Sequence, residues 1–194
     1  MRLILASRSP RRRDLLATIV REFEVVPSEV DETLEVGPTS EAVTRLAARK
    51  ARAVAARVGE GVVLGADTVV VLTGDALGKP GGPGEARAML RRLRGREHEV
   101  ITAIAVVDAR RGREASRAVV SRVLMADYSD AMIDTYVASG SPLDKAGAYA
   151  IQDLGGGLVA RLVGSYTNVV GLPVEETREL LAAFGVPLRA PQAP

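Results

Sequence analysis

The sequence predicts an α/β fold built on a mixed sheet. Apolar runs rich in β-branched residues alternate with amphipathic stretches along the chain, as they do in α/β domains. Two long runs, 98–108 and 116–128, are joined by a short polar turn, so we expect them to pair as antiparallel strands. Because no repeat or linker interrupts the alternation, we expect a single domain over residues 1–186 and a flexible tail over 187–194.

The chain opens with a strand, a tight loop and a helix. Residues 2–6 are a short apolar run, and Pro10 suits the first position of a helix whose N-cap is Ser7 or Ser9. Residues 23–27 are again apolar and β-branched, which indicates a second strand.

The middle of the chain combines a long helix with a long strand. Residues 40–58 place apolar side chains on one helical face, and residues 62–72 have the β-branched content of a buried strand. A turn over 73–77 and a loop of glycines and prolines over 78–84 lead to a helix over 85–94.

The last part of the chain follows the two antiparallel strands. Ser129 caps a helix that ends near residue 138, and a long glycine-containing loop comes next. Residues 158–164 read as a strand, and a closing helix runs from Pro173 to a stop at Gly185.

Composition excludes several classes of function. The 194 residues include no cysteine and one histidine, His98, so zinc ribbons and thiol chemistry are excluded and any metal must be held by oxygen atoms. We interpret His98 as structural. A net charge of +2 and 3% aromatic residues argue against a nucleic-acid surface. No segment approaches the roughly 18 apolar residues of a membrane span and no signal peptide is evident, so we expect a cytoplasmic protein.

Three consecutive arginines, Arg11, Arg12 and Arg13, fall in the first turn of the predicted N-terminal helix. The free N–H groups and the dipole of a helix N-terminus attract anions, so added cations favour a phosphate site there. A solvated basic turn paired with Asp14 or Glu22 is the alternative, and the turn alone does not decide between them.

Asp67 is the most informative residue of the sequence. It interrupts the apolar strand 62–72, where a carboxylate is costly unless it meets a cation, a metal or strong donors. A metal ligand or a general base is therefore favoured over an aspartate exposed where the strand emerges. Thr68 points to the opposite face of the strand and is a candidate hydroxyl donor.

Other charged residues are candidates to complete such a site. Lys79 lies in a glycine-flanked loop where the backbone can approach a phosphate, and Lys50 is a second phosphate candidate, although a helical lysine is more often at the surface. Mg²⁺ takes one or two carboxylates and keeps water and phosphate oxygens for the rest. An acidic segment offers such a ligand, with a solvated loop as the alternative, through Glu29, Asp31, Glu32 and Glu35.

Six blocks of the sequence belong together: LASRSPRRRDLL (5–16), GADTVV (65–70), GKP (78–80), HEVITA (98–103), PLDKAGAYAIQ (142–152) and GSYTNVVGLPVEET (164–177). In this order and spacing they resemble the Maf family of nucleoside triphosphate pyrophosphatases, over nearly the whole chain. The resemblance implies an elongated, ITPase-like α/β fold whose mixed sheet, flanked by helices, forms a deep cleft between two lobes. It also implies hydrolysis between the α and β phosphates with a divalent cation, Mg²⁺ or Mn²⁺.

The resemblance further implies roles for residues at matching positions. Asp67 corresponds to the proton acceptor of the family, and it either orients the attacking water or helps to hold the metal. Ser7 and Arg11 would line the nucleotide pocket, and Glu32 would assist with the metal.

Lysines of the matching blocks would act on the phosphates. Lys50 and Lys79 would neutralise the charge that builds up as the anhydride breaks. Asp144 and Lys145 match a further block near the cleft, for which a salt-bridged loop is the alternative.

Base choice is implied in the same way. Family members that act on dTTP and UTP are similar to this chain in carrying Arg11, Thr68 and Gln152 at three specificity positions. The amide of Gln152 offers a donor and an acceptor, which suit the N3–H and a carbonyl of uracil or thymine.

Two other functions stay open at this point. A sister subgroup resembles these proteins but prefers 7-methyl-GTP, and the family's association with septum formation allows a nucleotide-responsive regulator of cell division. The balanced charge and the few aromatic residues count against direct DNA binding. The expected partner is therefore a nucleoside triphosphate. Many family members form homodimers, although no stripe in this sequence indicates one.

Overall fold

A computed structural model describes residues 1–32, 39–153 and 157–190 of the protein. These residues form one mixed sheet in the order β2-β1-β3-β5-β6-β7, with β4 paired to β3 outside this path. Strand β1 is parallel to both β2 and β3, and the remaining pairs are antiparallel. The strands are β1 (Leu3–Leu5), β2 (Glu24–Val25), β3 (Val62–Leu72), β4 (Asp75–Leu77), β5 (Glu97–Asp108), β6 (Glu114–Met125) and β7 (Val159–Val163).

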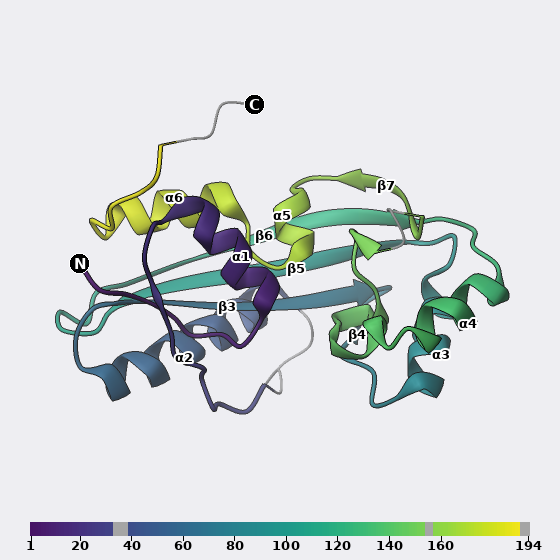
Figure 1. Ribbon diagram of the computed structural model, residues 1–194, viewed down its shortest axis with the longest axis horizontal. Coiled ribbons are helices and arrows are strands. Elements are labelled where there is room, and N and C mark those ends of the chain that lie inside the picture. The colour runs from purple at the N-terminus through teal and green to yellow at the C-terminus, as the bar shows by residue number, and fades with distance from the viewer. Residues whose placement is uncertain (33–38, 154–156, 191–194) are drawn as a thin grey trace.

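Helices cover both faces of the sheet and one of its ends. They are α1 (Pro10–Ile19), α2 (Ser40–Val58), α3 (Pro83–Leu93), α4 (Asp130–Ala138), α5 (Tyr166–Val170) and α6 (Val174–Ala183), with short 3₁₀ turns η1 (Ser141–Asp144) and η2 (Ala146–Ala148). Figure 1 shows α2 on one face of the long strands and α1 with α6 on the other, while α3 and α4 lie together at the far end. The molecule is elongated along β3, β5 and β6.

The predicted α/β class with a mixed sheet is confirmed, as is the antiparallel pairing of the two long strands. The 19-residue helix α2 has the predicted bounds. Of the two candidate N-caps of α1, Ser9 is the one whose side chain accepts a hydrogen bond from a backbone N–H of the first turn, that of Arg12. Ser9, and not Ser7, is therefore the N-cap of α1.

Two elements differ from the prediction because they are too short to carry a periodic pattern. The residues expected to form a turn include β4, which forms a tight hairpin with β3 through Thr73 and Gly74. Both turn residues have positive φ, of 50° and 89°, as a type I′ turn requires. Helix α5 has five residues and begins at a side-chain cap on Ser165.

The apolar core is divided by the sheet, and β3 contributes to each part. Val62 and Leu64 pack with α1 and α6 on one face, and Val63 packs with α2 on the other. Farther along the same strand, Val70 and Leu72 pack with α3 and α4 at the far end. The separate parts of the core thus share a strand.

One edge of β3 is open in the middle. Strand β1 pairs with residues 62–64 of this edge and β4 pairs with residues 70–72. Between them, residues 65–69 have no partner strand on this side in the described part of the chain. Gly65 allows α2 to cross here, because a Cβ atom at this position would lie 2.4 Å from the carbonyl oxygen of Ala47. A cavity opens at this gap in the edge of β3.

The C-terminal segment is described as far as residue 190. The backbone N–H of Arg189 donates to the carbonyl of Ile19 at 2.7 Å, and its Nε donates to the carbonyl of Val20 at 2.9 Å. The expected flexibility of 187–194 stays a prediction. Among the helices that the structure describes, none combines the length and the apolar composition needed to cross a bilayer.

Candidate active site

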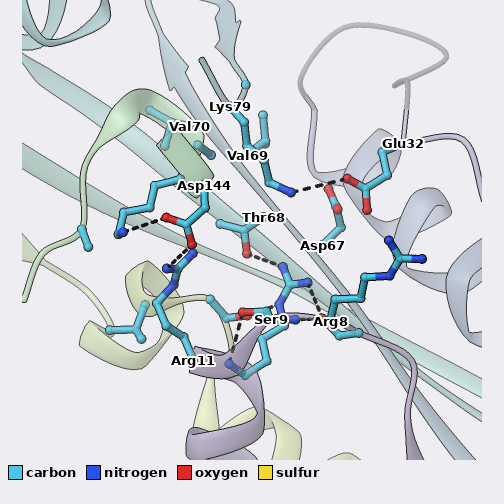
Figure 2. Close-up of a pocket in the computed structure, with 18 of the residues that line it drawn as sticks. Arg8, Ser9, Arg11, Glu32, Asp67, Thr68, Val69, Val70, Lys79 and Asp144 are labelled. Atoms are coloured by element: carbon cyan, nitrogen blue, oxygen red, sulfur yellow. Dashed lines mark hydrogen bonds and ion pairs between the residues drawn. The ribbon is translucent and has the colours of Figure 1, made fainter. Parts of the chain in front are cut away.

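A cavity of about 980 Å³ opens at the gap in the edge of β3. Its walls come from the start of α1, the segment 28–32, helix α2, the segment after β4 and the residues 144–152. Figure 2 shows Thr68 between a group formed by Asp67 and Glu32 and a pair formed by Arg11 and Asp144. The structure brings eight candidate site residues of the sequence to this cavity: Ser7, Arg11, Glu32, Lys50, Asp67, Thr68, Lys79 and Gln152.

Lys50 lies at the centre of the charged group. Although it belongs to a helix, it is only 3% exposed, because α2 crosses β3 closely at Gly65. Its Nζ is 2.7 Å from Oδ1 of Asp67 and 2.7 Å from Oε1 of Glu32. The surface position usual for a helical lysine is therefore not the one observed, and one buried cation joins two carboxylates.

Glu32 is held in its ionised form by the cations around it. Partial burial acts to raise its pKa, but the hydrogen bond from Lys50 and the attraction of Lys50, Lys79 and Arg12 outweigh burial and lower the pKa. Nζ of Lys79 lies 3.9 Å from Oε2 of Glu32, and its side chain is exposed (Figure 2). At neutral pH, Glu32 is thus a carboxylate with a cation on either side.

Arg12, the middle one of the three adjacent arginines, makes hydrogen bonds to several segments around the cavity, a role that the sequence did not indicate. Its Nε donates to the carbonyl of Gly171 at 2.8 Å, and Nη1 donates to Oγ of Ser7 at 3.3 Å and to the carbonyl of Ala66 at 3.0 Å. Its Nη2 donates to Oγ1 of Thr68 at 3.0 Å. Burial lowers the pKa of Arg12. This side chain therefore ties α1 to the open edge of β3.

The three arginines of α1 have different surroundings, so both interpretations of the cluster apply to part of it. Arg11 and Arg12 line the cavity, as an anion site requires. Arg13 is exposed and lies 3.6 Å from a carboxylate oxygen of Asp14, as in a solvated turn. Helical geometry is the signal that separates them, since consecutive residues point about 100° apart around the axis.

An ion pair spans the cavity from α1 to η1. Nη1 of Arg11 is 3.1 Å from Oδ2 of Asp144, and Nζ of Lys145 is 2.8 Å from Oδ1 of the same residue (Figure 2). Burial acts to raise the pKa of Asp144, but these two cations lower it. The salt-bridged loop offered as an alternative is thus present, and it lines the cavity.

Thr68 faces the opposite side of β3 from Asp67, as predicted. Its Oγ1 lies 2.9 Å from Oγ1 of Thr102, which donates to the carbonyl of Asn168 at 2.9 Å. Gln152 is exposed on the wall of the cavity, and its side chain has no hydrogen-bond partner among the described residues. Its amide is therefore available to a ligand.

The charges of the cavity suit an anionic ligand. Its described lining holds six lysines and arginines against four aspartates and glutamates. The described residues contain no group of three or more histidines, cysteines or carboxylates that could hold a metal ion. Glu32 and Asp67 are a pair of carboxylates, which matches the one or two that Mg²⁺ takes from protein. Of the acidic segment, Glu29 also lines the cavity and Glu35 lies outside the described residues.

His98 lies away from this group of charges. It is buried in β5, and its Nε2 is 2.7 Å from the hydroxyl of Tyr149. Burial lowers the pKa of His98 to about 4, so the ring is neutral at physiological pH. A neutral histidine in an apolar setting agrees with the structural role inferred from the sequence.

Comparison with known proteins identifies proteins that share the fold and the family to which the chain belongs. A nucleoside-triphosphatase (dITP/XTP pyrophosphatase) from Mycobacterium abscessus shares the fold with a TM-score of 0.51 at 17% identity, over 95% of this chain and 98% of the other. The α/β fold is thus the ITPase-like fold that the resemblance implied. The model of the family "Maf-like protein" matches residues 2–184, and the chain belongs to this family.

Curated relatives extend over nearly the same length. The dTTP/UTP pyrophosphatase of Syntrophus aciditrophicus is 49% identical over 95% of this chain and 90% of its own. The protein of the same name from Moorella thermoacetica is 50% identical over 95% of this chain and 96% of its own. The resemblance drawn from the six sequence blocks is confirmed.

Proposed function

We propose that the protein hydrolyses the α–β phosphoanhydride of dTTP and UTP to the nucleoside monophosphate and pyrophosphate. The observation that carries this proposal is Lys50, buried between the carboxylates of Asp67 and Glu32 in a basic cavity. The names of the relatives, about half identical to the chain, support it. A triphosphate carries about four negative charges, and the surplus of two cations in the described lining would balance about half of them.

The proposed reaction is an in-line displacement. The oxygen of a water molecule forms a bond to the α-phosphorus, and the bond from this phosphorus to the bridging oxygen breaks, which releases pyrophosphate. Asp67 accepts the proton of the water. Lys79 and Lys50 stabilise the negative charge on the phosphate oxygens, while Ser7 and Arg11 hold the nucleotide.

A divalent cation fits the donors that the cavity offers. Glu32 and Asp67, whose carboxylates lie on either side of Nζ of Lys50, would hold it, and phosphate oxygens and water would complete its shell. Bound there, Mg²⁺ or Mn²⁺ supplies charge neutralisation and polarises the phosphoryl group.

Base selection is proposed to depend on the wall opposite this group. The amide of Gln152 would pair with N3–H and a carbonyl of thymine or uracil, and Arg11 and Thr68 would set the depth at which the nucleotide lies. We further propose that the protein works in the cytoplasm on free nucleotides. The homodimer expected from the family stays a prediction, which light scattering can test.

Pyrophosphate release from purified protein with Mg²⁺ or Mn²⁺ tests the proposal. We expect release from dTTP and UTP well above release from other nucleotides, and loss of release in Asp67→Asn. Asp134→Asn, which changes an exposed carboxylate paired with Arg87, is the matched control and should keep full activity. Selectivity for 7-methyl-GTP would assign the chain to the sister subgroup, and no release from any triphosphate would favour a regulatory role.

A further inference from the structure

Gln152 lies between two residues, Ala150 and Asp153, that one buried side chain holds. The hydroxyl of Tyr136, from α4, accepts a hydrogen bond from the N–H of Ala150 at 3.2 Å. The same hydroxyl donates to Oδ2 of Asp153 at 2.5 Å. Tyr136 is 2% exposed, and burial together with Asp153 raises its pKa, so the hydroxyl keeps its proton. The residues on both sides of Gln152 are therefore tied to a single atom.

The carboxylate of Asp153 is held from other directions as well. Its Oδ2 accepts a hydrogen bond from Oγ of Ser141 at 2.7 Å and lies 3.8 Å from Nζ of Lys145. Lys145 in turn donates to the carbonyl of Ser141, and the N–H of Asp153 donates to the carbonyl of Ala150 at 3.1 Å. The turn 150–153 is thus closed by a hydrogen bond within its own backbone. It is anchored through the carboxylate of Asp153, whose charge lies near the ammonium group of Lys145.

The side chain of Gln152, unlike the residues around it, makes no hydrogen bond within the described part of the chain. It is exposed on the cavity wall. A free amide on a fixed backbone is the arrangement of a recognition group whose supporting residues are already in place.

We propose that Tyr136 is a positioning residue for base selection, whose hydroxyl fixes the turn 150–153 so that the amide of Gln152 meets the N3–H and a carbonyl of uracil or thymine. This inference rests on the proposed function. The amide can turn over about its last side-chain bond and then pairs equally well with N3 and the amino group of cytosine. A purine carries its pairing edge farther from the ribose than a pyrimidine does, so a fixed turn lets Gln152 distinguish thymine or uracil from a purine.

The variant Tyr136→Phe removes the hydroxyl and keeps the ring. We expect the ratio of kcat/KM for dTTP to that for dATP to fall by about tenfold, the cost of misplacing one hydrogen-bonding group. The change should appear as a higher KM for dTTP with kcat within about twofold. Asp153→Ala, which removes the acceptor at a partly exposed site and leaves Tyr136 intact, should have the same effect.

Tyr128→Phe is the matched control. Tyr128 is a buried tyrosine of the same apolar cluster, and its hydroxyl donates to the carbonyl of Leu90 at 2.8 Å, away from the turn. Its loss removes one buried hydrogen bond and should leave the base ratio unchanged. A general loosening of the lobe would instead lower the ratio in both variants, and that result would overturn the inference.

Amide hydrogen exchange separates failure of this inference from failure of the proposed function. Exchange at Ala150 and Asp153 should be faster in Tyr136→Phe than in the wild type, and unchanged in Tyr128→Phe. If the wild type prefers dTTP and Tyr136→Phe keeps the ratio within twofold, Tyr136 does not position Gln152. If the wild type shows no such preference, the proposed function is wrong. In that case unchanged exchange would overturn the anchoring role of Tyr136 by itself.

Discussion

Among single residues, Lys50 is a buried cation shared by two carboxylates. Its ammonium group is nearly inaccessible to water, and its two carboxylate partners differ in exposure, with 13% of the Asp67 side chain exposed and 58% of that of Glu32. A charge removed from water is tolerable only when its partners stay in place. Asp67 depends on Lys50 more than Glu32 does, because Glu32 can be solvated if the lysine is removed.

Lys50→Met should therefore lower the free energy of unfolding by about 3 kcal/mol, the cost of leaving a buried charge unpaired. Urea denaturation at pH 7 measures the effect. Lys79→Met changes an exposed lysine of the same cavity and should change stability by no more than about 0.5 kcal/mol. Adding Asp67→Asn to Lys50→Met should recover part of the loss. A double variant no more stable than Lys50→Met would contradict this account.

Among the elements, the crossing of α2 over β3 sets the geometry of the charged group. A Cβ atom on Gly65 would lie 2.4 Å from the carbonyl oxygen of Ala47 and 2.8 Å from the backbone nitrogen of Ala51. Both atoms belong to the helix backbone, which cannot turn aside as a side chain can. The distance from Lys50 to Asp67 therefore depends on the absence of a side chain at Gly65.

Gly65→Ala should push α2 away from the sheet, destabilise the fold by about 1–3 kcal/mol or more, and abolish activity. Thermal unfolding and pyrophosphate release measure the two effects. Gly84→Ala is the matched control, since a Cβ atom there meets nothing within 4 Å in the first turn of α3, and it should leave stability unchanged or slightly raised. Equal effects of the two substitutions would show that the crossing is not tight.

Strand β5 contains a buried titratable group, the imidazole of His98, which contacts the hydroxyl of Tyr149. His98 has a pKa lowered to about 4 by burial, and its Nδ1 has no partner among the described residues, so the folded protein resists protonation. The unfolded chain takes up this proton below about pH 6.5. The contribution of His98 to stability should therefore be constant above about pH 7 and fall as the pH drops toward 4.

Between pH 6.5 and 5 this difference amounts to about 2 kcal/mol in the free energy of unfolding. Urea denaturation across this range measures it, and His98 is the only histidine of the chain, so its titration is isolated. His98→Gln should flatten the profile within this window. A slope that persists in the variant would assign the pH dependence to other groups.

At the scale of the whole molecule, we expect the two cores on either side of the cavity to unfold together. Strand β3 supplies Val62 and Leu64 to the core near α1 and Val70 and Leu72 to the core near α3, so the two cores share one hydrogen-bonded ladder (Figure 1). Breaking either core exposes a strand that the other still needs. The single domain over residues 1–186 stays a prediction.

Thermal unfolding should show one cooperative transition. Near-ultraviolet circular dichroism reports mainly on the far lobe, where Tyr128, Tyr136 and Tyr149 are buried and the chain has no tryptophan. Far-ultraviolet circular dichroism reports on the whole sheet. The two signals should have the same midpoint, and a saturating non-hydrolysable dTTP analogue should raise both together. Loss of the tyrosine signal at a lower temperature would show that the lobes are independent.

The sequence predicts more of the fold than of the site's connections. Periodicity locates the long elements, and a carboxylate in an apolar strand singles out Asp67. Arg12, in contrast, is one of three adjacent arginines, and only the packing of α1 against β3 shows which of them points inward. Tyr136 lies in a helix and Asp153 in a loop, 17 residues apart. No local pattern joins them, because their contact depends on how the loop folds back onto α4.

The open edge of β3 also bears on solubility. Unpaired strand edges recruit strands from other molecules and begin aggregation. Here the unpaired stretch is five residues long, and β1 and β4 bound it at its two ends. Arg12 further occupies the carbonyl of Ala66 within it. The unpaired stretch is too short for stable pairing with a strand of another molecule, and the charged side chain of Arg12 lies across it. The backbone polar groups of this edge can therefore be open to a small ligand without promoting aggregation.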